Sequence, residues 1–211
     1  MKVCSFLPAA TQMIYDMGLQ EHLHGVTFEC SKQALKEKRK VVRYVLEGNT
    51  YTSIEIDKIF SASKTQGKSM YYVDDAILQQ IQPDIIFTQD VCKVCQIDTA
   101  CTSAAVAKLT KQLLLIPLTP NNLVDVFTTV IVIAKAMGKE ETAYKYLAGL
   151  QHKIDFIIDE MRRKRALPKR ALLIEWIEPI YNCGHWIPDQ IAYAGGIDML
   201  GNPGGDSMVI S

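Results

Sequence analysis

The side chains best suited to chemistry lie in residues 83–95, which read PDIIFTQDVCKVC. Gln89 and Asp90 offer hydrogen-bonding groups to a ligand. Cys92 and Cys95 have the C-x-x-C spacing that occurs in zinc sites and in redox dithiols. The segment can therefore bind a polar ligand, hold a metal ion or exchange electrons, or it can be a loop with two ordinary cysteines.

A zinc site at this position needs ligands beyond the C-x-x-C pair, because no second such pair is present. Cys30 or Cys101 can supply a third thiolate, and we take Cys92, Cys95 and Cys30 as the candidate metal ligands. The redox alternative fits less well, since thioredoxin-like motifs open a helix in a different context. A metal contact, a redox pair and neither role all remain open.

The element that positions this segment is a short apolar run, residues 85–87, bounded by Pro83 and polar residues. Such runs are typical of buried strands in a parallel sheet. Ligands of open α/β sheets bind just beyond the carboxyl ends of such strands. We therefore expect Gln89, Asp90, Cys92 and Cys95 to lie where a site would form.

Strand-like and helix-like patterns alternate along the chain. We expect strands at residues 3–7, 23–28, 41–45, 85–87, 112–117 and 171–174. We expect helices at residues 9–17, 53–63, 71–82, 102–110, 123–137, 140–165 and 187–194, with a loop or short helix at 31–39. Alternation of this kind predicts an α/β fold with a parallel sheet and right-handed crossovers.

The long helical stretch divides the chain into an N-terminal α/β lobe at residues 1–120, connecting helices at 121–168 and a partial C-terminal α/β lobe at 169–211. The last part contains one clear strand and one clear helix. A stable sheet needs more strands than that. We therefore expect the C-terminal lobe to be truncated in this chain.

The bulk composition is that of an ordinary globular protein. Lys and Arg together number 23, as do Asp and Glu, so the formal net charge is zero and nothing favours nucleic acid as a partner. The basic run at residues 162–165 is best explained as a helix C-terminus that complements the helix dipole. No segment is long and apolar enough to span a membrane, and the N-terminus does not resemble a signal peptide. We expect a cytoplasmic protein as the sequence stands, or a periplasmic or cell-surface protein if a leader was removed.

Five motifs occur in a fixed order: SFLPAAT at residues 5–11, GVTFEC at 25–30, the 83–95 segment, EWIEPIY at 175–181 and GHWIP at 184–188. Together they resemble the cobalamin-type, helical-backbone (class III) substrate-binding proteins of ABC importers. This resemblance implies two Rossmann-like lobes joined by a long helix, with the ligand held between the lobes. It also implies a protein that is not an enzyme and that delivers a corrinoid, haem or other metal chelate to an ABC permease.

The resemblance places the candidate ligand-binding residues on strand ends of both lobes. They are Pro8, Thr11, Glu29, Cys30, Tyr44, Gln89, Asp90 and Cys92 from the first lobe, and Glu175, Trp176, His185 and Trp186 from the second.

These residue types suit a large planar ligand, because aromatic faces bury much apolar area at a small entropic cost. Gln89, Asp90 and Glu175 can bond amide side chains around a corrin ring. His185 is either an axial ligand to cobalt or iron or a turn histidine bonded to backbone. Trp176 is either a ligand platform or core filler.

Catalytic motifs give no competing prediction, since the sequence has no G-x-S-x-G, H-E-x-x-H or G-x-x-x-x-G-K-[ST] pattern. Our leading hypothesis is a solute-binding protein that needs no cofactor and takes a cobalamin-like or haem-like chelate as ligand. Its partners are an ABC permease and, as a further hypothesis, a second copy that completes the short C-terminal lobe. The alternative is a cytosolic metal- or thiol-dependent protein on the same fold, with zinc held by Cys30, Cys92 and Cys95.

Overall fold

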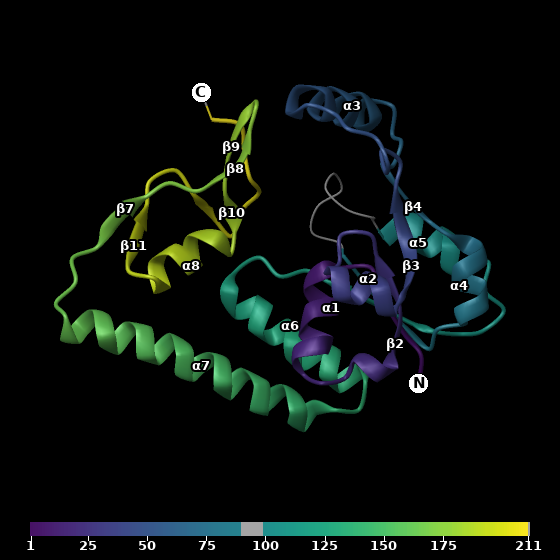
Figure 1. Cartoon of the computed structure of the whole chain (residues 1–211), viewed down its shortest axis with the longest axis horizontal. Helices are drawn as coiled ribbons and strands as arrows, with labels where there is room; N and C mark the ends of the chain where they lie inside the picture. The colour runs from purple at the N-terminus through teal and green to yellow at the C-terminus, as the bar shows by residue number, and fades with distance from the viewer. Residues whose placement is uncertain (90–98, 211) are drawn as a thin grey trace.

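The computed structural model describes residues 1–89 and 99–210. Within them, the N-terminal part forms a six-stranded sheet in the order β4-β3-β2-β1-β5-β6 (Figure 1). Neighbouring strands pair in parallel except for β3 and β4, which are antiparallel. The strands are β1 (Val3–Ser5), β2 (Leu23–Thr27), β3 (Arg39–Tyr44), β4 (Tyr71–Val73), β5 (Ile85–Gln89) and β6 (Leu114–Leu118).

Alternate side chains of the central strands enter two separate cores, one on each face of the sheet. On β5, Ile85 and Phe87 join one core and Ile86 joins the other. The first core includes residues of α1 (Pro8–Asp16) and α6 (Leu123–Ala136). The second includes residues of α4 (Asp75–Ile81) and α5 (Thr99–Val106). Both faces are thus covered, which explains why the strands read as continuous apolar runs.

The order of the strands reverses between β1 and β5. From β1 the chain moves outward through β2, β3 and β4 on one side, whereas β5 and β6 lie on the other side. Ligands of open α/β sheets bind at the carboxyl ends of the strands at such a switch point. The loop after β1 and the residues that follow β5 are therefore the positions from which a site would be built.

Two helices lead from this sheet to the C-terminal lobe. The side chain of Asn122 caps α6 by accepting a bond from the amide of Asp125, at 2.9 Å. Gly138 then separates α6 from α7 (Glu140–Arg163) with a left-handed φ of +67°. Figure 1 shows one end of α7 near α6 and α1 and the other end below the C-terminal lobe. Among the described helices, none combines the length and hydropathy required to cross a bilayer.

Short strand pairs, rather than one sheet, make up the C-terminal lobe. β7 pairs with β11 and β10 with β12, both in parallel, while β8 and β9 form an antiparallel hairpin. Of the described apolar side chains in this lobe, those of Cys183, Pro188 and Ile191 are buried. The elements are β7 (Lys169–Ala171), β8 (Ile174–Ile177), β9 (Ile180–Asn182), β10 (Gly184–His185), α8 (Ile187–Tyr193), β11 (Gly196–Asp198) and β12 (Asn202–Pro203).

Most of the predicted elements are present, and residues 31–39 contain the short helix α2 (Lys32–Glu37), while α3 spans Ser53–Thr65. The 3₁₀ turn Gln20–His22 and the strands β9, β10, β11 and β12 were not predicted. The boundaries assigned to the three parts of the chain stay predictions.

Two predictions about elements were wrong. The helix expected at residues 71–82 starts later, because Tyr71–Val73 is strand β4 and the Asp74 carboxylate caps α4 through the amide of Ile77. The strand expected at residues 171–174 is split, since β7 ends at Ala171 and β8 begins at Ile174. The C-terminal lobe consequently has more strands than the single one expected, each too short to show a period in the sequence.

Candidate functional site

The first candidate residue, Pro8, opens α1 directly beyond β1. Its ring fixes φ at a helical value, and it lacks the amide hydrogen that would be unpaired at this position. Leu7 precedes it and provides no side-chain cap, while the Ser5 hydroxyl donates to the Leu7 carbonyl at 2.9 Å. The N-terminus of α1 therefore presents uncapped amides at the switch point, where polar acceptors are favoured.

Thr11 and Cys30 are in contact with each other behind the strand ends. The Cys30 thiol donates to the Thr11 hydroxyl at 3.2 Å, and both side chains are buried, with 2% and 6% exposure. Burial raises the pKa of the Cys30 thiol. This pair joins α1 to the loop after β2 and so fixes the position of the neighbouring Glu29.

An aromatic cluster lies beside Glu29 and contains one predicted residue, Tyr44. Its ring stacks on Phe28 at a centroid distance of 5.4 Å and an interplanar angle of 9°, and on Tyr71 at 5.3 Å and 26°. Phe28 and Tyr71 complete the triangle at 6.0 Å. Sequence reasoning missed Phe28 and Tyr71. The signal available was an aromatic residue immediately before Glu29 and a Tyr-Tyr pair before the Asp74 cap.

Glu29 and Tyr44 interact electrostatically. Partial burial raises the pKa of the Glu29 carboxyl. For Tyr44, burial is again the largest cause of a raised pKa, followed by the negative charge of Glu29. The two side chains thus combine a flat apolar surface with a carboxyl group that keeps its proton to a higher pH than a solvated one, because its pKa is raised.

The third strand end carries Gln89, which is partly buried at the end of β5. Asp90, Cys92 and Cys95 lie outside the described residues, as does the side chain of Cys101. No three His, Cys, Asp or Glu residues in the described part of the chain come together as a metal site. The zinc set of Cys92, Cys95 and Cys30 stays a prediction.

In the C-terminal lobe, Glu175 and Trp176 lie on the β8–β9 hairpin. Trp176 is partly buried, pairs across the hairpin with Tyr181, and donates its indole NH to the Glu178 carbonyl at 2.9 Å. Glu175 is exposed and accepts a hydrogen bond from the Ser207 hydroxyl. The indole is held in place by the hairpin itself, which is compatible with either role predicted for it.

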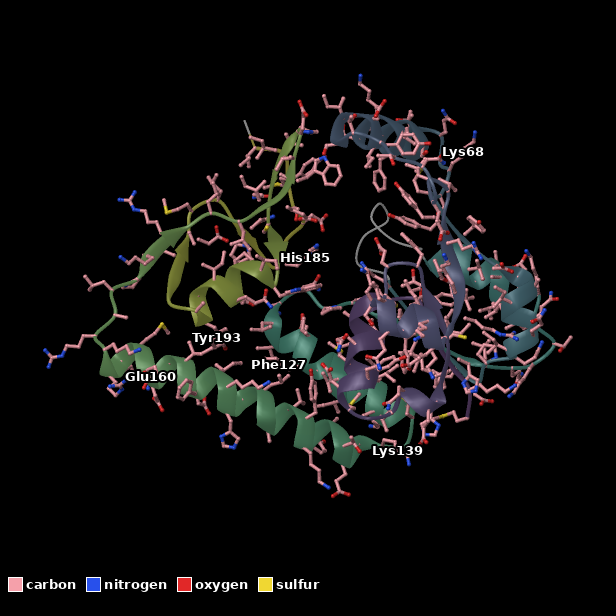
Figure 2. All side chains as sticks on the ribbon, viewed as in Figure 1. Lys68, Phe127, Lys139, Glu160, His185 and Tyr193 are labelled. Carbon is pink, nitrogen blue, oxygen red and sulfur yellow. The ribbon has the colours of Figure 1, made fainter. Side chains whose placement is uncertain are left out.

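His185 occupies a constrained turn next to Trp186. Its φ is +52°, a left-handed value that is uncommon outside glycine, and bonds to Gly205 and Gly204 hold its backbone amide and carbonyl. Its Nε2 lies 3.7 Å from an Asp206 oxygen, and its buried Nδ1 has no partner among the described residues. Figure 2 shows His185 on the side of the C-terminal lobe that faces the N-terminal part. Both interpretations of its ring stay open.

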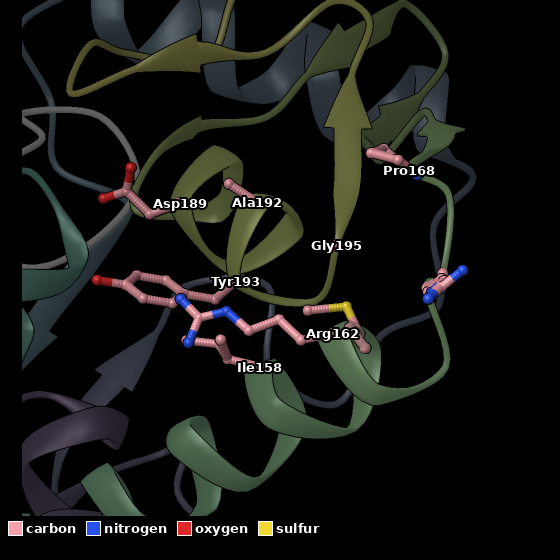
Figure 3. A pocket seen from close by; sticks show the side chains of 10 residues that line it. Ile158, Arg162, Pro168, Asp189, Ala192, Tyr193 and Gly195 are labelled. Carbon is pink, nitrogen blue, oxygen red and sulfur yellow. The ribbon is translucent and has the colours of Figure 1, made fainter.

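A separate groove of about 520 Å³ lies between α7 and α8 (Figure 3). Ile158, Met161 and Tyr193 form much of its apolar wall, and Arg162 and Asp189 contribute charges. It includes none of the predicted ligand-binding residues. The groove is therefore a feature separate from the candidate ligand-binding residues, whose roles stay predictions.

Comparison with solved structures shows which known proteins share this fold. No protein-family model and no curated protein matches this chain. Among solved structures, the periplasmic vitamin B12-binding protein BtuF of Vibrio cholerae matches with a TM-score of 0.59 and 16% identity. The periplasmic haem-binding protein RhuT of Roseiflexus matches with a TM-score of 0.66 and 14% identity. A possible iron-binding, periplasmic solute-binding protein of Staphylococcus epidermidis matches with a TM-score of 0.63 and 14% identity.

Each of these matches covers 100% of this chain and 70% of the neighbour's chain. The fold predicted from the motifs, an α/β substrate-binding fold with a helical backbone, is therefore confirmed. So is the expectation that the chain contains only part of the second lobe of that fold. Each neighbour is named for what it binds and none for a reaction.

Proposed function

We propose that this chain is a solute-binding protein of an ABC importer that captures a corrinoid or a related metal chelate between its lobes. The observation that carries the proposal is the match of the whole chain to B12-, haem- and iron-binding proteins. The strand order supports it, because the loop after β1 and the end of β5 flank the switch point. Such a protein acts by binding and not by catalysis.

The charges near the strand ends favour an amide-bearing chelate over an anionic one. The described candidates include no Lys or Arg and carry two carboxylates, Glu29 on one lobe and Glu175 on the other, while Gln89 adds an amide. Propionate groups of haem would meet like charges there, which disfavours binding. The side-chain amides of a corrin can instead donate to those carboxylates, while its ring lies against aromatic faces.

Isothermal titration calorimetry with cyanocobalamin, cobinamide, haemin and zinc tests the proposal. We expect binding of a corrinoid that is tighter than that of haemin. Trp176→Ala should weaken it about ten-fold, the order of one lost aromatic contact in a binding site. Tyr193→Ala is the matched control, because this aromatic side chain lies in the α7–α8 groove. Absence of binding to every chelate would reject the proposal.

The zinc arm of the same titration tests the alternative. If zinc binds, and Cys92→Ser abolishes that binding while no chelate binds, the protein is better described as a metal- or thiol-dependent protein on this fold. Cys183→Ser is the control for the substitution itself, since Cys183 is buried in the C-terminal lobe.

We also propose an ABC permease as the partner and a location outside the cytoplasmic membrane, as in the neighbours named periplasmic. Glu178 is the proposed docking carboxylate, because it is exposed at the tip of the β8–β9 hairpin. Glu178→Lys should reduce transport in cells without changing the affinity for the chelate. Unchanged transport would remove Glu178 from the docking surface, and cell fractionation tests the location.

A further inference from the structure

The aromatic cluster of Phe28, Tyr44 and Tyr71 has a geometry that limits what it can bind. Its three ring planes are nearly parallel, with interplanar angles of 9°, 24° and 26°. A cage for an organic cation needs ring faces that turn toward a common centre, and rings at these angles do not enclose one. Nearly parallel rings can instead be extended as a stack, and the group that extends a stack best is another flat aromatic ring.

Three strand ends hold this cluster in place. Phe28 directly follows β2, Tyr44 ends β3 and Tyr71 begins β4. Tyr44 and Tyr71 lie opposite each other in the antiparallel pair, and the Phe28 amide donates to the Val42 carbonyl at 3.1 Å. The backbone thus fixes the rings before any ligand binds, so that little conformational entropy is lost when a ligand stacks on them.

Part of the cluster remains open to a ligand. Tyr71 is the inner ring, with 9% exposure, whereas Phe28 and Tyr44 are only half-buried. Because β2 and β3 run parallel to β1 and β5, their carboxyl ends lie at the same edge of the sheet as Pro8 and Gln89. The cluster therefore adds an aromatic surface to the edge at which the proposed ligand binds.

Two parts of a corrinoid differ in how well they fit such a surface. The corrin ring can pack against a single side chain such as Trp176, but it carries methyl groups and amide chains on both faces, which keep it from extending a stack of parallel rings. The lower base, which a nucleotide attaches to the corrin, is flat and fully conjugated. It is the part of the ligand that can stack closely on the cluster.

From this fit we propose that the cluster of Phe28, Tyr44 and Tyr71 stacks on the lower base and thereby selects corrinoids that carry the lower nucleotide. Glu29 directly follows Phe28, so its carboxylate can accept hydrogen bonds from the ribose hydroxyls of that nucleotide. The inference rests on the function proposed above, and it names the part of the ligand that the N-terminal lobe reads.

Calorimetric titration with two probes tests the inference. Cyanocobalamin carries the lower base, and cobinamide lacks the whole lower nucleotide. We expect the wild type to bind cyanocobalamin more tightly. Tyr44→Leu removes a flat ring and should weaken cyanocobalamin binding about ten-fold, the order of one lost base–aromatic stack, without changing the affinity for cobinamide. Tyr44→Phe keeps the ring and should restore most of the affinity for cyanocobalamin.

Tyr72→Leu is the matched control. Tyr72 is adjacent to Tyr71 on β4, but successive side chains of a strand point to opposite faces, and Tyr72 is 45% exposed. This variant should bind both probes as the wild type does. Equal wild-type affinities for the two probes, equal losses for both in Tyr44→Leu, or no loss for either would overturn the inference and leave the proposed function standing. A wild type that binds neither probe would reject both.

Proton NMR of the wild-type complex gives a test that needs no variant. Nuclear Overhauser effects should connect the ring protons of Tyr44 to those of the lower base of cyanocobalamin. Contacts from Tyr44 to the corrin methyl groups, without any to the base, would overturn the inference. Circular dichroism shows whether Tyr44→Leu folds, and the Overhauser effects decide if it does not.

Discussion

The backbone amide of Leu123 donates a hydrogen bond to the Asp189 carboxylate at 2.9 Å, which joins the first turn of α6 to α8 of the C-terminal lobe. These residues are 66 positions apart in the chain. The bond satisfies one of the amides that a helix N-terminus leaves without an intrahelical partner, and the negative charge complements the helix dipole. It is a direct contact between the connecting helices and the second lobe.

Asp189→Ala should lower the free energy of unfolding by about 1 kcal/mol, as the loss of a helix cap does. Asp189→Asn keeps an acceptor oxygen without the charge and should cost less. Urea denaturation measures both values. Asp155→Ala is the control, because Asp155 is exposed on α7 and bonds Gln151 within the same helix. Equal losses for Asp189→Ala and Asp155→Ala would contradict this account.

Adding a methyl group at position 25 should lower the free energy of unfolding. A Cβ built on Gly25 of β2 lies 2.6 Å from the Cys4 sulfur and 2.6 Å from a Val41 methyl group, in the buried core. Gly25→Ala should therefore destabilise the protein by about 1–3 kcal/mol through overpacking.

The matched control for Gly25→Ala is Gly149→Ala, where a Cβ meets nothing within 4 Å in the middle of α7. That change should stabilise the helix by about 0.5–1 kcal/mol. Thermal or urea unfolding measures both variants. If Gly25→Ala and Gly149→Ala changed the free energy of unfolding in the same direction, the close packing around Gly25 would be contradicted.

Much of the N-terminal lobe could be predicted because its signals are local. The apolar run at residues 85–87 marks β5, and Asn122 and Gly138 mark the ends of α6. The aromatic cluster was missed, because Tyr44 meets Tyr71 only through the pairing of β3 with β4, and Phe28 joins them only through the pairing of β2 with β3. Strands of two residues such as β10 carry no periodicity, and their pairing depends on tertiary contacts alone.

The stability of the protein should fall in alkaline solution because of Cys4. Burial raises the pKa of this thiol from 9.0 to about 12. The unfolded chain then loses the proton near pH 9 while the folded protein keeps it, so folding stability is complete below pH 9 and declines as the pH rises toward 12. The slope contributed by one such group is at most about 1.4 kcal/mol per pH unit.

Cys4→Ala should flatten this decline, and the difference from the wild-type curve isolates the thiol. The comparison is necessary because burial also raises the pKa of Tyr15 and of Tyr146 to about 12, and both act in the same direction. Urea unfolding at several pH values from 8 upward provides the measurement. If the free energy of unfolding falls equally with pH in the wild type and in Cys4→Ala, the pKa of the Cys4 thiol is not raised in the folded protein.

The pKa of Tyr44 should report on its neighbour Glu29. Glu29→Gln removes a negative charge that raises the pKa of Tyr44, so this pKa should fall. It should stay above 10.0, because burial is the larger cause of the rise. Titration of ¹³C-labelled tyrosine by NMR resolves the individual rings. Glu47→Gln, an exposed change whose carboxylate bonds Lys40, should leave Tyr44 unaffected. An equal change in the pKa of Tyr44 in both variants would show that the charge of Glu29 has no specific effect on Tyr44.

The 24 residues of α7 form a helix about 36 Å long, and they are followed by a short connection to β7. A continuous helix of this length resists bending at its middle, so we expect small tilts or twists between the two lobes rather than a large hinge opening. In the binding role that we propose, the empty protein would therefore already hold much of the shape of its ligand-bound form, and little ordering would oppose binding. In that proposed role, release of the ligand would then require a small relative shift of the two lobes, which the permease would have to produce.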